Sequence, residues 1–370
     1  MTDADMNDRL DVFRKKLSLA REEFLERGFS GLIFAIRRHL DKRRKTVPYF
    51  AELRKRFKAR KYDGSLVLFR PHGVGDLLMG LSAFKKFRRD NPKKRILLYV
   101  YEESASLMRL FDYFDEVVSL PRSFDYKNSL AELPLPKQAK FVDLMVEVSA
   151  ETGYVFFDTP ENRLHRNDTF SARLGVPLGY EKVCLPRDEA AHLAAMRLIS
   201  DAKIDADKLV TVTFESMSPN RVWYPPYYKV FLESVIDEGF TVIIVGNRQV
   251  DSGLFPDSDR FLNLIGKTEN LKEVAELVRL STAVISVDTY LCHLAGIMDI
   301  PILGIFTGGV NPDARLCYYE RKEVVTATLP CACWDMGCRD SQLSGVEPCK
   351  VDLTPSIAMA SFKELIRKYG

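Results

Sequence analysis

The residues best suited to chemistry lie at two strand–helix junctions about 210 residues apart in a chain of 370 residues. The first is Gly73-Val-Gly-Asp76 and the second is Asp288-Thr-Tyr-Leu-Cys-His293, and each follows an apolar run. In open α/β sheets the ligand crevice lies beyond the carboxyl ends of the strands, so both junctions should line a cleft. An aspartate there can take a proton, and the free N–H groups of a helix start favour a bound phosphate. The pattern predicts two facing α/β domains that transfer a group from a phosphorylated donor.

Each junction also has a purely structural interpretation. Asp76 could cap its helix, because an aspartate accepts bonds from the free N–H groups there. Asp288 is better suited to capping than to phosphate, since two anions repel. The Thr289 hydroxyl can add a bond to a phosphate and His293 shares its helix face, but a capped helix with a core histidine remains an alternative. Gly-Val-Gly is not the full dinucleotide fingerprint, so the case for a nicotinamide cofactor is weak.

A third polar segment follows the strand predicted at Leu209–Phe214. It reads Glu-Ser216-Met-Ser-Pro-Asn-Arg221-Val-Trp223 and should face the same cleft. Arg221 can neutralise a phosphate with its planar fork of donors, and Trp223 can pack beneath the next helix. The alternative is a surface arginine beside a packing tryptophan.

Alternating strands and helices must position these residues. Two βαβ series with right-handed crossovers follow from the pattern. Their expected strands are Leu66–Phe69, Arg95–Tyr101, Glu116–Leu120, Val155–Asp158, Leu209–Phe214, Phe240–Val245, Phe261–Ile265, Ala283–Val287 and Pro301–Phe306. Their expected helices follow Asp76 and Ser104 and cover Glu161–Leu174, a stretch after Pro186, Pro226–Glu238, Leu271–Ser281, Thr289–Met298 and Pro355–Tyr369.

Length and composition are those of an ordinary globular protein, with 46% hydrophobic and 28% charged residues. The chain is long enough for two cores. We place a helical basic extension at 1–61, an N-terminal Rossmann-like acceptor domain at 62–205, a C-terminal Rossmann-like donor domain at 206–354 and a final helix at 355–370. The apolar stretch from Gly28 to Ile36 is nine residues long and is preceded by acidic and basic residues, so it does not predict a secretory signal, and no run of about 18 apolar residues predicts a membrane span. These features predict a cytoplasmic protein.

Together, the motifs resemble those of the family-9 glycosyltransferases, the ADP-heptose:lipopolysaccharide heptosyltransferases and their relatives. The resemblance rests on Gly-x-Gly-Asp-Leu early on, Arg-x-Trp, Gly-Lys-Thr-Glu-Asn-Leu-Lys-Glu-Val, and Asp-Thr-x-x-x-His-Leu-Ala, in that order. It covers roughly residues 64–365. It implies a GT-B fold, two Rossmann-like domains facing a cleft, and inversion at the anomeric carbon without a catalytic cofactor.

The resemblance also implies roles for single residues. The family's proposed base matches Asp76, and the cation that contacts the donor diphosphate matches Arg221, where lysine is usual. The phosphate-cradling stretch matches Asp288, Thr289, Tyr290 and His293, with Tyr290 in place of the usual glycine. We add Ser216 to the donor side. On the acceptor side the expected residues are His72, His165 and Arg166.

The predicted function is an inverting transferase that moves a sugar, a heptose from ADP-heptose as first choice, to a saccharide or lipopolysaccharide-type acceptor. The substitutions at Arg221 and Tyr290 leave the donor identity open. The alternatives are a GT-B epimerase or phosphorylase and a non-catalytic nucleotide-sugar-binding protein.

Four cysteines lie within residues 331–349. Soft thiolates suit zinc or iron, so Cys331, Cys333, Cys338 and Cys349 predict a structural metal site, with disulfides and free thiols as alternatives. Because the four cysteines follow the last predicted strand, we expect the metal site to stabilise a loop and to have no part in catalysis.

Residues 37–61 hold twelve Lys or Arg against Asp41 and Glu52, a net charge of +10 in a chain whose total is +3. Phe50, Leu53 and Phe57 interleave with the charges. The stretch could lie on an anionic membrane surface at the inner face, where lipid-linked acceptors reside, or it could be a solvated helical face. No recognised nucleic-acid module accompanies it, so no nucleic-acid partner is expected.

Overall fold

The structure, a computed structural model, describes residues 42–124, 126, 130–145, 164–204, 207–248, 250–307, 311–327 and 347–370. The helices expected before residue 42, the strand expected at Val155–Asp158 and the cysteines Cys331, Cys333 and Cys338 lie outside these residues. Within them, no helix combines the length and apolarity needed to cross a membrane.

The first sheet has four strands in the order β3-β2-β1-β4. They are β1 (Leu66–Phe69), β2 (Ile96–Tyr101), β3 (Glu116–Leu120) and β4 (Lys140–Asp143). β1 pairs in parallel with β2, Leu66 opposite Ile96, and every side chain of both strands is buried, as expected for continuous apolar runs covered on both faces. The sequence analysis did not predict β4, a partly exposed edge strand.

Four helices accompany this sheet: α3 (Val74–Met79), α4 (Leu81–Asp90), α5 (Glu102–Met108) and α8 (Arg166–Leu174). The single helix expected after Asp76 is two helices, because the chain breaks at Gly80. Helix α8 begins at Arg166, five residues later than predicted, and its N-cap is His165, whose ring accepts a bond from the backbone N–H of Asn167. Helix α9 (Glu189–Asp201) follows, capped by Asp188.

The second sheet has six parallel strands in the order β10-β9-β8-β5-β6-β7. They are β5 (Leu209–Thr213), β6 (Thr241–Ile244), β7 (Phe261–Asn263), β8 (Ala283–Val287), β9 (Ile302–Phe306) and β10 (Lys322–Thr326). Five agree with predicted strands, and β10 was missed. The order reverses between β5 and β8, which is the switch point where open α/β sheets bind ligands.

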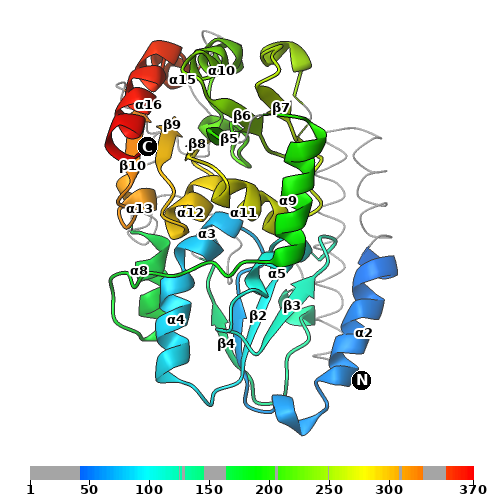
Figure 1. The fold of residues 1–370 in the computed structure, drawn as a ribbon. Helices are drawn as coiled ribbons and strands as arrows, with labels where there is room; N and C mark the ends of the chain where they lie inside the picture. The colour runs from blue at the N-terminus through cyan, green and yellow to red at the C-terminus, as the bar shows by residue number, and fades with distance from the viewer. Residues whose placement is uncertain are drawn as a thin grey trace. The chain divides into compact units, whose positions relative to one another are not determined.

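Helices cover both faces of the second sheet. They are α10 (Tyr228–Asp237), α11 (Leu271–Arg279), α12 (Tyr290–Ile297), α13 (Asp313–Leu316), α15 (Pro348–Asp352) and α16 (Pro355–Tyr369). Helices α10 and α16 pack on one face, and α11 and α12 pack on the other, as Figure 1 shows. The final helix has the predicted bounds.

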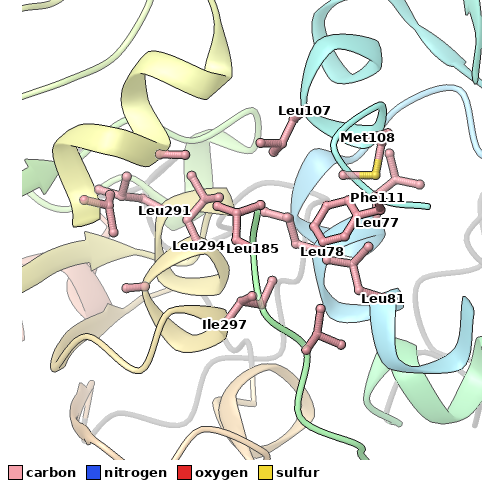
Figure 2. Packing of buried hydrophobic residues seen from close by; sticks show 14 of the residues in the cluster. Leu77, Leu78, Leu81, Leu107, Met108, Phe111, Leu185, Leu291, Leu294 and Ile297 are labelled. Atoms are coloured by element: carbon pink, nitrogen blue, oxygen red, sulfur yellow. The ribbon is translucent and has the colours of Figure 1, made fainter. Parts of the chain in front are cut away.

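A single apolar cluster links the two sheets. Helix α3 packs against α12, and Figure 2 shows the side chains that meet there, with Leu77 and Leu78 of α3 on the same seam as Leu291 and Leu294 of α12. Leu185, in the segment between α8 and α9, joins them. All these side chains are 6% exposed or less, so the seam between the helices is dry.

The chain divides into two compact units, residues 1–65 with 120–140 and residues 66–119 with 141–370. The first unit contains α2 (Val47–Arg56), whose Phe50 and Leu53 are buried. The ring of Phe50 meets that of Phe124 at 5.2 Å. The catalytic candidates all belong to the second unit, and the predicted domain boundaries stay predictions.

Candidate active site

Asp76 lies in the first turn of α3, just beyond the carboxyl end of β1. The helix is capped by Gly73, whose φ of 83° is in the left-handed region that glycine favours. The carboxylate pairs with two guanidinium groups, that of Arg70 through Oδ2 and that of Arg166 through Oδ1 at 2.9 Å. The capping interpretation of Asp76 is therefore wrong, because its oxygens are directed at arginines.

These arginines determine the protonation state of Asp76. Burial raises the pKa of this carboxyl, but the positive charges of Arg70, Arg166, Arg315 and Arg221 outweigh it and hold the pKa well below its usual range. Asp76 is ionised throughout the physiological range. Its side chain is 18% exposed, so the ionised group is still reachable from solvent.

Asp288 follows β8 at the switch point of the second sheet. Its Oδ2 lies 3.2 Å from Nη1 of Arg221 and 3.6 Å from Nε of Arg315. Burial raises its pKa, while Arg221 and Arg315 lower it more, so that the net direction is down. The capping role expected for Asp288 is wrong: the N-cap of α12 is Thr289, and no side chain bonds to the helix there.

The remaining donor-side candidates surround Asp288. Ser216 is buried, and its hydroxyl donates to the backbone carbonyl of Asp288 at 3.5 Å. Thr289 and Tyr290 are half-buried at the start of α12. His293 is 2% exposed, with Nδ1 3.4 Å from the hydroxyl of Tyr319, and burial lowers its pKa to about 4. It is therefore neutral at pH 7.

Gly75 brings the two junctions together. A Cβ at this position would lie 3.0 Å from Cδ2 of His293 and 3.6 Å from Cα of Tyr290. The second glycine of Gly-Val-Gly thus permits the close approach of α12 to α3. As a result, the charges of the two junctions act on each other: Arg221 and Arg315 lower the pKa of Asp76.

The three expected acceptor residues have different surroundings. Arg166 is part of the site through Asp76. His165 is buried, and its ring meets that of Tyr318 at 4.8 Å; burial lowers its pKa to about 3, so it is neutral. His72 is half-buried before the helix.

Trp223 packs as predicted beneath the next helix. It is fully buried, its ring meets that of Phe231 at 5.3 Å, and Nε1 donates to the carbonyl of Leu353 at 2.7 Å. This packing holds the segment that carries Arg221, which is half-buried and ion-paired, so that the interpretation of Arg221 as a surface arginine is wrong.

Sequence reasoning missed two members of the site, Arg70 and Arg315. Arg70 directly follows a buried strand, a position that places it at the carboxyl end of the sheet and could have identified it. Arg315 follows β9, the neighbour of β8, but it belongs to no motif, and only the strand order brings it to Asp288.

The described residues include one of the four cysteines of the predicted metal site. Cys349 is buried, and the other three cysteines of the cluster lie outside the described residues. Where the structure is described, no three potential ligands gather around one point. The metal site stays a prediction.

Two doubly wound halves with charged side chains at the carboxyl ends of their strands define the GT-B class of α/β fold. Residues 165–343 match the model of glycosyltransferase family 9 (heptosyltransferase). Lipooligosaccharide heptosyltransferase 2 of Haemophilus influenzae is 24% identical over 165 residues, which is 40% of this chain and 44% of the relative. The chain thus aligns with less than half of that relative's length.

Two solved structures have the same fold. The E. coli ADP-heptose lipopolysaccharide heptosyltransferase II gives a TM-score of 0.61 at 15% identity over 82% of this chain and 99% of its own. The dodecameric iron-containing heptosyltransferase TibC of enterotoxigenic E. coli, in complex with ADP-D-beta-D-heptose, gives 0.56 at 17% identity over 84% and 77%. These comparisons confirm the predicted fold class and the predicted resemblance to glycosyltransferase family 9, and they support the prediction of a transferase.

Proposed function

We propose that this chain is an inverting glycosyltransferase that moves a heptose from ADP-heptose to a saccharide acceptor of the lipopolysaccharide type. The family match and the substrates in the relatives' names support the donor and acceptor classes. The observation that carries the chemistry is the ionised carboxylate of Asp76, which lies in one electrostatic site with Arg221 and Asp288.

In this mechanism the acceptor hydroxyl oxygen attacks the anomeric carbon while the bond from that carbon to the diphosphate breaks. The hydroxyl proton passes to Asp76. Because the surrounding arginines hold its pKa low, Asp76 is a weak base, and it takes the proton late, when the attacking oxygen has become acidic by bonding to carbon. Arg221 and the N-terminus of α12 stabilise the charge that develops on the departing diphosphate.

Arg221 provides the direct test of donor binding. Arg221→Ala should weaken binding of ADP more than binding of adenosine, while Arg221→Lys, which restores the family's usual residue, should retain most of the affinity. Lys229→Ala, an exposed change on α10, is the control. Equal losses for ADP and adenosine would remove Arg221 from the diphosphate site.

Turnover separates the three functional classes. A transferase releases ADP from ADP-heptose at a rate that depends on a saccharide acceptor. Donor consumption that is independent of acceptor would favour an epimerase or a phosphorylase, and tight binding without turnover would favour a nucleotide-sugar-binding protein. Other nucleotide-sugars measured in the same assay determine whether the donor is ADP-heptose.

We further propose that the protein works at the cytoplasmic face of an anionic membrane. Its basic segment exposes eight described cations beside Glu52 and Asp63; they are Arg44, Lys45, Arg54, Lys55, Arg56, Lys58, Arg60 and Lys61. Phe50, Leu53 and Phe57 are buried, so the contact would be electrostatic, without insertion of an apolar face. Binding to phosphatidylglycerol vesicles should fall with salt and with Lys55→Glu/Lys58→Glu, and binding that is unchanged by both would exclude this surface.

The structural metal remains part of the proposal. TibC is described as iron-containing, and thiolates suit iron and zinc. Elemental analysis of protein purified without added metal should find about one ion per chain. A metal content near zero, with Cys331, Cys333 and Cys338 open to alkylation in the native protein as judged by peptide mass spectrometry, would reject the metal site.

A further inference from the structure

Arg315 occupies the strand-end edge where the donor-side candidates gather. It lies on α13, which follows β9, while Asp288 follows the adjacent strand β8. The residue is 8% exposed. Its Nε side faces Asp288, at 3.6 Å from Oδ2, and this orientation leaves the Nη1 side of the fork for another partner.

Nη1 of Arg315 has no hydrogen-bond partner among the residues that the structure describes, although the atom is buried. A buried donor without an acceptor is costly to maintain, and more so when it belongs to a charged group. Burial also lowers the pKa of Arg315, the direction expected for a cation that is incompletely compensated. An acceptor that arrives with a ligand would remove this cost.

The charges of the surrounding site indicate which ligand that is. Among the residues that the structure describes, the guanidinium groups of Arg70, Arg166, Arg221 and Arg315 share the site with two carboxylates, those of Asp76 and Asp288. His293 is neutral at pH 7, because its pKa is about 4. The site therefore has an excess of two positive charges, which matches a dianionic diphosphate.

We propose that Arg315 is a second diphosphate-binding residue, which donates from Nη1 to a non-bridging phosphate oxygen of the donor while its Nε side stays on Asp288. Arg221 binds the same diphosphate from the neighbouring strand end. When no donor is bound, Asp288 holds the guanidinium groups of Arg221 and Arg315 in position. The inference rests on the proposed function and adds to it a residue outside the motifs. Arg315 then stabilises the diphosphate both when the donor binds and when the bond from the diphosphate to the sugar breaks.

The test uses the full-length protein and measures binding of ADP and of adenosine by calorimetry, together with KM for the nucleotide-sugar. Arg315→Gln should weaken ADP binding at least about tenfold and adenosine binding less than about twofold. Arg315→Lys keeps the charge beside Asp288 but cannot reach the carboxylate and the phosphate at once. It should fold normally and still lose most of the ADP affinity, so the test does not depend on the stability of the glutamine variant.

Arg279→Gln is the matched control, because Arg279 also pairs with a buried carboxylate in the same half, that of Glu276, at 3.1 Å. It should leave ADP affinity unchanged. If Arg315→Lys binds ADP as the wild type does, or if ADP and adenosine lose affinity equally, Arg315 only neutralises Asp288 and the inference is wrong. If the wild type binds no nucleoside diphosphate, the proposed function itself is wrong.

Discussion

Replacement of Asp76 by asparagine tests both the chemistry and the electrostatics of the site. The side chain keeps its shape and loses its charge, so the buried guanidinium groups of Arg70 and Arg166, 1% and 2% exposed, lose their counter-ion. Removal of one partner from a buried ion pair costs about 3–5 kcal/mol. Because Asp76 is 18% exposed, water compensates part of the lost interaction. We therefore expect the substitution to lower the free energy of unfolding by about 3 kcal/mol.

The same substitution should lower kcat by about 10²–10⁴-fold, the contribution typical of a positioned general base, with little change in ADP affinity. Urea unfolding gives the stability, and initial rates on the folded protein give kcat. Asp115→Asn is the control: Asp115 pairs with Arg88 at 2.6 Å outside the site, so its loss should leave kcat unchanged.

The stability difference between wild type and Asp76→Asn should also depend on pH in a defined way. The folded pKa of Asp76 lies below its unfolded value, so the stabilisation is fully present above about pH 5 and disappears only as the pH falls below about 4. Near-normal kcat in Asp76→Asn would refute its role as the base. Unchanged stability at pH 7 would refute the account of its ion pairs.

Three further outcomes are expected. Gly75→Ala puts a Cβ 3.0 Å from Cδ2 of His293. It should lower the free energy of unfolding by about 1 kcal/mol, because the cost of overpacking exceeds the gain in helix propensity. In urea titrations this loss should be smaller when His293 is also replaced by alanine. Between pH 6.5 and about 4 the unfolded chain binds a proton that folded His293 does not, so stability falls as the pH falls, and His293→Gln should flatten that slope by up to about 1.4 kcal/mol per pH unit. Trp223→Phe removes the bond to the carbonyl of Leu353 and should lower the unfolding free energy by about 1–3 kcal/mol, whereas Tyr224→Phe, at a half-buried ring, should change it little.

The strands that bury both faces were predictable from the sequence. Leu66–Phe69 is a continuous apolar run, and Ala283–Val287 is apolar except for Ser286; each strand has the predicted bounds. The edge strands β4 and β10 were not, because Lys140-Phe-Val-Asp and Lys322-Glu-Val-Val-Thr contain charges that an edge tolerates and a centre does not. The other two edge strands, β3 and β7, were predicted, because their sequences Glu116-Val-Val-Ser-Leu and Phe261-Leu-Asn keep an apolar pair.

The candidate site was predictable at the level of its motifs and not at the level of its ion pairs. Asp76 and Asp288 follow strands, so their place at the sheet edges followed from the pattern. Their partners did not: Arg166 lies 90 residues beyond Asp76, and Arg315 reaches Asp288 only because β9 lies beside β8. Asp76 was predicted as the base with capping as its alternative, and Asp288 was thought better suited to capping, because local spacing cannot detect a distant guanidinium.

The contact at Gly75 has a consequence for attempts to exchange halves between relatives. The first half presents a glycine, and the second fills the space above it with the ring of His293 and the backbone of Tyr290. Leu77 and Leu78 meet Leu291 and Leu294 along the same seam. A chimera that joins one half of this chain to the other half of a relative should therefore pack poorly where α3 meets α12, unless both contact surfaces come from the same protein. The two halves have the topology of independent domains, but their packed junction requires that both contact surfaces change together.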